Sequence, residues 1–167
     1  MSRWRPPAPK SAPYITVEGY RALEKEQAAL WERRKDVTAA LSAAAAEGDR
    51  SENAEYIYRK KELREIDRRI GYLQRRMPNL RVVDQVGDTE HVYFGAWVEL
   101  EDLDESRRWY RIVGADEISS QHYISMDSPL ARLLMRKSVG DCVEWRHGEI
   151  EHDYEIVSIA YGAQQPF

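Results

Sequence analysis

The sequence predicts an α+β protein: an N-terminal antiparallel α-helical coiled-coil hairpin followed by a small, mostly antiparallel β domain with one short helix. Three observations support this prediction. Apolar residues recur at alternating steps of three and four through most of the first 79 residues. A short segment with a glycine, residues 48–53, interrupts that spacing. From Leu80 onward the pattern changes to short runs rich in β-branched and aromatic residues.

The length and composition limit the protein class. The chain has 167 residues, of which 43% are hydrophobic and 32% charged, so it can form one or two small domains with a core. No apolar run approaches the roughly 18 residues of a membrane span, and the N-terminus does not resemble a secretory signal. The single cysteine, Cys142, excludes an intrachain disulfide and is expected in the core. We therefore expect a cytoplasmic protein with no membrane partner.

Charge is distributed unevenly along the chain. Residues 1–79 contain 17 Lys or Arg and 12 Asp or Glu, whereas residues 80–167 contain 8 and 17. This asymmetry indicates two modules with different partners. We place the boundaries at 1–13 for a flexible, proline-rich tail, 14–79 for the hairpin with an acidic tip at 48–53, and 80–167 for the β domain.

The hairpin is predicted from two heptad seams in series. Thr16 is the expected N-cap of the first helix, and Pro78 is expected to end the second. Pairs such as Leu30 with Ile70 and Val37 with Leu63 would face each other if the chain folds back near residue 50. The seam residues of the two arms are Tyr20, Leu23, Gln27, Leu30, Arg34, Val37, Leu41 and Ala44, and then Tyr56, Arg59, Leu63, Ile66, Ile70, Leu73 and Met77.

The β domain is predicted from short runs separated by turn signals. Pro129–Arg136 is expected to be its helix, with Ser128 as N-cap. Trp97, Trp109 and Trp145 are expected in its core. The predicted strands are Leu80–Val83, Val92–Phe94, Trp97–Leu100, Trp109–Val113, His122–Ile124, Val143–Trp145 and Tyr154–Ala160.

Two carboxylates, Asp49 and Glu52, lie at the predicted apex. One interpretation is structural: Asp49 or Ser51 caps the second helix, with an acidic side chain in its first turn. The other is chemical, because two carboxylates within one turn can share a Mg²⁺ ion through oxygen ligands. Two carboxylates alone would bind Mg²⁺ weakly, so such a site would need further ligands from another molecule.

The second arm carries an excess of positive charge. The segment from Arg59 to Arg76 contains eight Lys or Arg residues and only three acidic residues. Ordinary pairs spaced i, i+4 explain some of these residues but not the excess. A positive stripe beside an acidic apex suits a nucleic-acid backbone that leads toward a metal ion.

These residues resemble a known family. The apex and second arm, GDRSENAEY and YRKKELREIDRRIGYL, are similar to the bacterial transcript cleavage factors of the Gre family, and to the GreB branch in particular. The resemblance continues through FGAWVEL, YRIVGADEI and YISMDSPLARLLMRKSVGD, and it covers about residues 14–162. It implies that the β domain is FKBP-like.

The resemblance also implies a function. The C-terminal domain would dock at the rim of the secondary channel of core RNA polymerase, through a segment that contains Asp127, Ser128, Pro129 and Leu130. Asp49 and Glu52 would help to hold a second Mg²⁺ and its attacking water in the polymerase active centre, so that backtracked RNA is cut near its 3′ end. The RNA would be contacted by residues among Arg59, Lys60, Lys61, Arg64 and Arg68.

On this interpretation the protein is a cofactor of another enzyme's reaction and no enzyme itself. It would hold Mg²⁺ only in the complex with RNA polymerase and act as a monomer. Two alternatives stay open. A channel inhibitor would block the polymerase without cleavage, although such relatives carry altered, more acidic tips. An adaptor would use the apex carboxylates for helix capping alone.

Overall fold

The computed structural model describes residues 10–48 and 53–167 and divides into two compact units. The hairpin unit is Tyr20–Leu80, and the β unit contains the described residues up to Gly19 together with Arg81–Phe167. The hairpin was expected to begin at residue 14. The residues before Tyr20 group with the β unit instead, because the strand β1 (Tyr14–Thr16) pairs within that unit.

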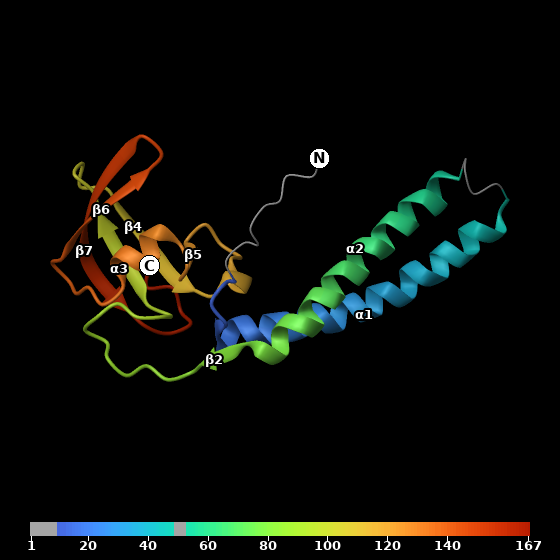
Figure 1. Ribbon diagram of the computed structural model, residues 1–167, viewed down its shortest axis with the longest axis horizontal. Coiled ribbons are helices and arrows are strands. Elements are labelled where there is room, and N and C mark those ends of the chain that lie inside the picture. The colour runs from blue at the N-terminus through green and yellow to red at the C-terminus, as the bar shows by residue number, and fades with distance from the viewer. Residues whose placement is uncertain (1–9, 49–52) are drawn as a thin grey trace, which may run out of the picture. The chain divides into compact units, whose positions relative to one another are not determined.

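Two long helices form the hairpin (Figure 1). α1 spans Val17–Ala46 and α2 spans Ala54–Arg76, followed by a short 3₁₀ turn, η1 (Met77–Asn79), that contains Pro78. The Thr16 hydroxyl accepts a hydrogen bond of 3.1 Å from the Gly19 amide, which confirms Thr16 as the N-cap of α1. Over the described part of the chain, no helix combines the length and the apolar composition that crossing a bilayer requires.

The predicted seams form the interface between α1 and α2. Val37, Ile66 and Ile70 make a buried cluster, against which Leu30 and Leu63 pack half-buried, so predicted seam residues of the two arms do meet. Polar residues reinforce the interface. The Arg34 guanidinium lies 2.7 Å from the Asp67 carboxylate, which explains how a charged residue occupies a seam position.

Two further ion pairs join the arms along their exposed edges. Arg69 donates two hydrogen bonds, of 2.6 and 2.9 Å, to the carboxylate of Glu26, and Arg33 pairs with Glu62 at 2.6 Å. These side chains are partly exposed to solvent, so each pair contributes on the order of 1 kcal/mol or less. The apolar seam therefore supplies most of the stability of the hairpin.

The β unit contains a five-stranded sheet in the order β5-β4-β3-β7-β6. Only the β4–β5 pair in this sheet is parallel. The predicted strand Val92–Phe94 is wrong: Val92 exchanges backbone hydrogen bonds with Arg136 and Lys137, after the last helix, so it lies outside the sheet. The strands are β3 (Trp97–Glu101), β4 (Arg107–Val113), β5 (Tyr123–Ser125), β6 (Cys142–His147) and β7 (Ile150–Ala160).

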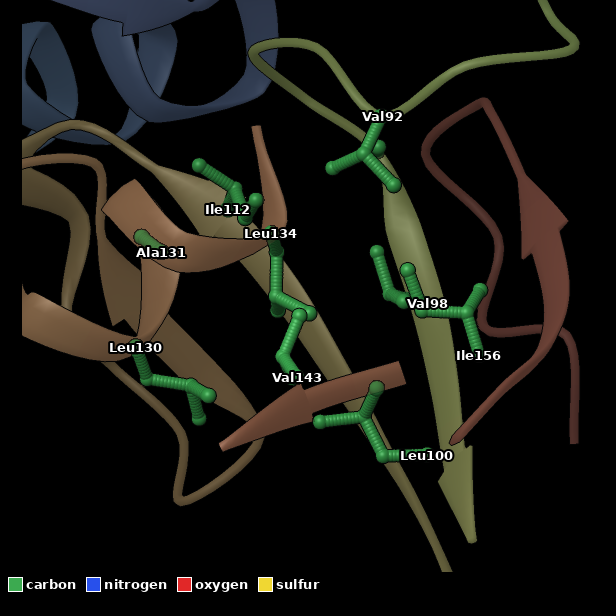
Figure 2. Packing of buried hydrophobic residues seen from close by; sticks show 10 residues of the cluster. Val92, Val98, Leu100, Ile112, Leu130, Ala131, Leu134, Val143 and Ile156 are labelled. Carbon is green, nitrogen blue, oxygen red and sulfur yellow. The ribbon is translucent and has the colours of Figure 1, made fainter. Parts of the chain in front are cut away.

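One face of this sheet is covered by α3 (Pro129–Leu134), whose predicted N-cap is confirmed by a hydrogen bond from the Ala131 amide to the Ser128 hydroxyl. The core lies between α3 and the sheet, as Figure 2 shows. This arrangement fixes α3, and the residues just before it, against a rigid support. The buried residues are Val92, Ala96, Val98, Leu100, Ile112, Leu130, Ala131, Leu134, Val143 and Ile156.

Two expectations about the core need correction. Trp97 is fully buried, but Trp109 and Trp145 are only half-buried. Cys142, expected in the core, is exposed. Strand alternation explains the difference at Cys142, because its neighbour Val143 points to the α3 side and the cysteine side chain therefore points the other way.

The segment before α1 is attached to the β unit. β1 pairs in parallel with β2 (Arg81–Val83), and the Arg81 amide donates a hydrogen bond of 2.6 Å to the Pro13 carbonyl. The Ala12 amide donates a hydrogen bond of 3.0 Å to the Asp127 carboxylate. Within the tail predicted for residues 1–13, the backbone of Ala12 and Pro13 is hydrogen-bonded to the β unit, and residues 1–9 lie outside the described residues.

Candidate functional site

The apex of the hairpin lies between the end of α1 at Ala46 and the start of α2 at Ala54. Gly48 has a φ of 125°, a conformation that favours glycine, so the chain turns immediately after α1. The predicted metal ligands Asp49 and Glu52 fall in residues 49–52, outside the described residues. Their proposed role consequently rests on the sequence and on the surroundings that the structure does describe.

Asn53 is the N-cap of α2. Its side-chain oxygen accepts a hydrogen bond of 3.1 Å from the Tyr56 amide, and its side-chain nitrogen donates one of 2.9 Å to the Ala44 carbonyl in α1. The structural interpretation in which Asp49 or Ser51 caps this helix is therefore wrong. Sequence reasoning missed Asn53, although asparagine is among the preferred N-cap residues.

A positive stripe follows the exposed surface of α2. Lys61, Arg64 and Arg68 lie on one side of the helix, because they are three and four residues apart. All three side chains are exposed, and none has a carboxylate partner within residues 10–48 and 53–167. Lys60 is also exposed, and its ammonium lies 5.8 Å from the centre of the Tyr56 ring.

Arg59 differs from the other predicted RNA ligands. Its guanidinium donates hydrogen bonds to Glu55 at 2.8 Å and to Glu62 at 3.0 Å, and these bonds raise the pKa of Arg59 above its ordinary value. Desolvation opposes the charge of Glu62, but hydrogen bonds from Arg33 and Arg59 outweigh it and lower the pKa of the Glu62 carboxyl. Arg59 thus belongs to a network that links the arms, whereas Lys60, Lys61, Arg64 and Arg68 leave their charges available.

The predicted docking residues lie at the start of α3. Ser128 caps the helix, Pro129 is exposed, and Leu130 is buried in the core, where its side chain cannot contact a partner (Figure 2). Asp127 is half-buried; its amide donates to the Ser125 hydroxyl at 3.1 Å and its carboxylate accepts from Ala12. The segment therefore offers a fixed carboxylate and a proline ring at the surface.

The described residues contain no group of three or more histidine, cysteine, aspartate and glutamate side chains that could hold a metal ion. The donor set at the apex, two carboxylates in the sequence GDRSEN, has the hard oxygen ligands that suit Mg²⁺. Asp49 and Glu52 therefore remain the candidate metal ligands of the chain.

Comparisons with known proteins agree with the architecture. Residues 13–82 match the family "Transcription elongation factor, N-terminal" and residues 87–161 match "Transcription elongation factor, GreA/GreB, C-term". The chain is 53% identical over 167 residues to a transcription elongation factor GreB of Xanthomonas axonopodis pv. citri, covering 98% of this chain and 99% of the relative. It is 51% identical over 164 residues to the GreB of Pseudomonas aeruginosa, covering 96% and 98%.

Matches to solved structures have low TM-scores. GreA factor homolog 1 of Thermus thermophilus is 24% identical, with a TM-score of 0.41 and coverage of 88% of this chain and 97% of the other. A GreA/GreB factor of Nitrosomonas europaea is 16% identical, with a TM-score of 0.41 and coverage of 92% and 100%. The family matches and the identity to curated relatives confirm the resemblance seen in the sequence. The chain belongs to the GreA/GreB family of transcription elongation factors, in its GreB branch.

Proposed function

We propose that this elongation factor binds core RNA polymerase, inserts its hairpin into the secondary channel and stimulates the Mg²⁺-dependent cleavage of backtracked RNA by the polymerase. On this proposal it works in the cytoplasm as a monomer and rescues arrested complexes. Membership of a transcription elongation factor family makes RNA polymerase the partner. The finer steps rest on the residues of the hairpin and of the β unit.

The observation that carries the proposal is the exposed stripe of Lys61, Arg64 and Arg68. Unpaired cations along a helix attract a phosphate backbone, and this attraction carries no sequence preference. Such a preference would be unwanted, since a polymerase can stall on any transcript. The stripe runs along the arm that begins at the acidic apex, so RNA held on it would lead toward Asp49 and Glu52.

The length of the hairpin fits insertion into a channel. The 30 residues of α1 correspond to about 45 Å at 1.5 Å per residue. Apolar residues pack between the arms, and ion pairs that join the arms reinforce this interface. A self-supported hairpin of this length can carry a reactive apex deep into a channel.

The chemistry is hydrolysis of one phosphodiester bond. Water attacks phosphorus and the bond to the 3′ oxygen breaks, so the retained RNA regains a 3′ hydroxyl and the released fragment carries a 5′ phosphate. Mg²⁺ held by Asp49 and Glu52 together with polymerase ligands would supply charge stabilisation and an activated water. The two carboxylates cannot do this without ligands from the polymerase, because two protein ligands alone bind Mg²⁺ weakly.

Docking is assigned to the segment before α3. Asp127 and Pro129 are its surface groups, and Ser128 fixes their geometry by capping the helix. Leu130 takes part only as a core residue that supports the segment. A partner surface that presents a cation to Asp127 would suit this arrangement.

The test is transcript cleavage in stalled, backtracked elongation complexes with Mg²⁺. The wild-type protein should shorten the RNA at its 3′ end, release fragments longer than dinucleotides and leave RNA that can be extended again. Asp49→Asn and Glu52→Gln should each bind the polymerase with unchanged affinity and lower the cleavage rate at least about a hundredfold, since each removes a ligand of a metal that stabilises the transition state.

Two other results would point elsewhere. RNA of unchanged length together with a block to renewed synthesis would mean that the protein acts as a channel inhibitor. Wild-type cleavage that survives both apex substitutions would remove Asp49 and Glu52 from the mechanism.

A further inference from the structure

The β unit contains a buried polar network that the proposed cleavage mechanism does not use. Glu117 lies in a short 3₁₀ turn, η2 (Ala115–Glu117), and only 7% of its surface is exposed. Its carboxylate accepts hydrogen bonds from the amide of Thr16 at 3.0 Å, the amide of Gly114 at 2.7 Å and the hydroxyl of Thr16. A buried carboxylate is costly unless it is fully hydrogen-bonded, and here three donors satisfy it.

These bonds hold the start of α1. Thr16 is the N-cap of that helix, and its hydroxyl accepts from the Gly19 amide while it donates to Glu117. The negative carboxylate therefore lies at the positive end of the helix macrodipole, which adds a favourable interaction. A residue about a hundred positions away in the sequence thus completes the cap of the first hairpin helix.

Close packing at two glycines shows that this contact is specific. A Cβ atom at Gly19 would overlap the carboxylate of Glu117, and one at Gly114 would overlap the carbonyl oxygen of Tyr14. Only glycine permits the helix start, β1 and η2 to approach this closely. Larger residues would push the first turn of α1 away from Glu117.

A second buried charge supports the same turn. Arg111 is 4% exposed, and its guanidinium lies 5.6 Å from the centre of the Trp97 ring and 5.9 Å from that of Tyr123. It donates a hydrogen bond of 3.2 Å to the carboxylate of Glu18, in the first turn of α1. Two independent side chains of the β unit therefore bind the first turn of the helix that leads into the hairpin.

We propose that Glu117 is a positioning residue for transcript cleavage: by capping α1 it makes the root of the hairpin part of the β unit, and delivery of the apex to the polymerase active centre depends on that attachment. The inference rests on the proposed function. Because α1 is one continuous helix from Val17 to Ala46, its first turn is the part of the helix that the β unit holds, and a loosened first turn would weaken that attachment. Cleavage is sensitive to such freedom, since displacement of a reacting group by about 1 Å can lower a rate by about a hundredfold.

The experiment combines two readouts on Glu117→Gln, in which an amide group replaces one carboxylate acceptor. Hydrogen exchange should accelerate at least about tenfold at the amides of Thr16 and Gly19 and stay unchanged in β3 and in the middle of the hairpin, since loss of a cap opens the structure locally. In the cleavage assay, the maximal rate at saturating factor should fall about tenfold or more, whereas the concentration for half-maximal effect should not change. A residue with a merely structural role would lower only the fraction of active factor. The concentration for half-maximal effect would then rise, and the maximal rate at saturating factor would not change.

Matched variants make the result decisive. Gly19→Ala displaces the same turn without altering any charge and should reproduce both effects, and Thr16→Val should do so more weakly. Glu144→Gln, at an exposed position of β6, should change neither readout. If Glu117→Gln unfolds the protein, as circular dichroism would reveal, Gly19→Ala and Thr16→Val carry the test.

Several outcomes would overturn the proposal. One is faster exchange at Thr16 and Gly19 with an unchanged maximal cleavage rate, because the anchor would then exist without affecting delivery. Another is unchanged exchange in all variants. Failure of the wild-type protein to stimulate cleavage would refute the proposed function instead, and the exchange data would still report on the anchor.

Discussion

The side chain of Asn53 joins the two arms of the hairpin: its oxygen caps α2, and its nitrogen donates a hydrogen bond of 2.9 Å to the carbonyl of Ala44 in α1. One residue thereby satisfies an orphan donor at the start of one helix and adds a second hydrogen bond to a carbonyl at the end of the other, which also accepts from the Glu47 amide. The bond lies next to the apex, so it limits how far the arms can separate beside the segment in which Asp49 and Glu52 are proposed to act.

Replacement of Asn53 should therefore loosen the apex end of the hairpin. Asn53→Ala removes both bonds and should lower the free energy of unfolding of the hairpin by about 1–2 kcal/mol. Asn53→Asp keeps an acceptor for the cap but loses the donor to Ala44, so its effect should be smaller. Hydrogen exchange of the amides near Tyr56 and Ala44 measures both losses. A stability of Asn53→Asp equal to that of the wild-type protein would show that the bond to Ala44 contributes nothing.

The charges on α2 should differ in their effects. Arg64→Gln combined with Arg68→Gln should weaken the dependence of cleavage on salt, because each lost phosphate contact lowers the slope of log affinity against log salt by about 0.7 for single-stranded nucleic acid. The measurement is the half-maximal factor concentration across a salt series, with complexes backtracked by several nucleotides.

Arg59→Gln is the matched control for that pair. Its guanidinium is already bound to Glu55 and Glu62, so the substitution should lower the stability of the hairpin slightly and leave the salt slope unchanged. A salt slope that drops equally in both proteins would mean that Arg59 leaves its carboxylates to contact RNA.

The pair of Glu18 and Arg111 should make stability depend on pH. Burial opposes the charge of Glu18, but hydrogen bonds from the backbone and from Arg111 outweigh it and hold the pKa of the Glu18 carboxyl below its ordinary value of 4.5. A carboxyl with a lowered pKa in the folded state stabilises the protein above pH 4.5, and this contribution is lost as the pH falls through the folded-state value.

Glu18→Gln tests this dependence. The wild-type protein should exceed the variant in unfolding free energy by about 0.5–1 kcal/mol at pH 7, a small value because the Glu18 side chain is 42% exposed. The difference should shrink progressively below pH 4.5 in urea titrations. A difference that persists at pH 3 would mean that packing and not charge sets the contribution of Glu18.

Ala12 offers a test of the docking segment through a single backbone hydrogen. Ala12→Pro removes the amide that donates to Asp127. If Asp127 binds the polymerase, the half-maximal factor concentration should rise several-fold while the maximal cleavage rate stays unchanged, the reverse of the pattern expected for Glu117→Gln. Ala12→Ser keeps the amide and should behave like the wild-type protein. An unaltered concentration dependence in Ala12→Pro would show that this bond does not orient Asp127 for docking.

Periodic features of the fold could be predicted from the sequence. The seam spacing identified Val37, Ile66 and Ile70 as buried because a heptad pattern has one physical solution, a helix interface. Thr16 and Ser128 were predicted as caps because their hydroxyls precede helical patterns at the usual distance. Such signals are local, so one sequence is sufficient to find them.

Features that depend on distant partners could not be predicted. β1 has three residues and forms only because β2, at Arg81–Val83, pairs beside it. The buried state of Glu117 depends on donors in Thr16 and Gly114, and nothing near it in the sequence distinguishes it from Asp116. Cys142 is exposed because the side chains of β6 alternate between the two faces of the sheet, and Val143 points toward α3. Composition does not determine which of the two residues points inward. For the candidate site, the positive stripe was predicted, but the neutralisation of Arg59 by Glu55 and Glu62 was not.

The hydrogen bonds that join the segment before α1 to Glu117 and Asp127 have a consequence for synthesis on the ribosome. The contacts within the hairpin connect neighbouring segments, so this unit can fold as soon as residue 80 has emerged. β1 can pair with β2 soon afterwards, but the Thr16–Glu117 and Ala12–Asp127 bonds span 101 and 115 positions, so these bonds form only after most of the chain has been made. A nascent chain stalled before Glu117 should therefore contain a folded hairpin and an incompletely folded β unit.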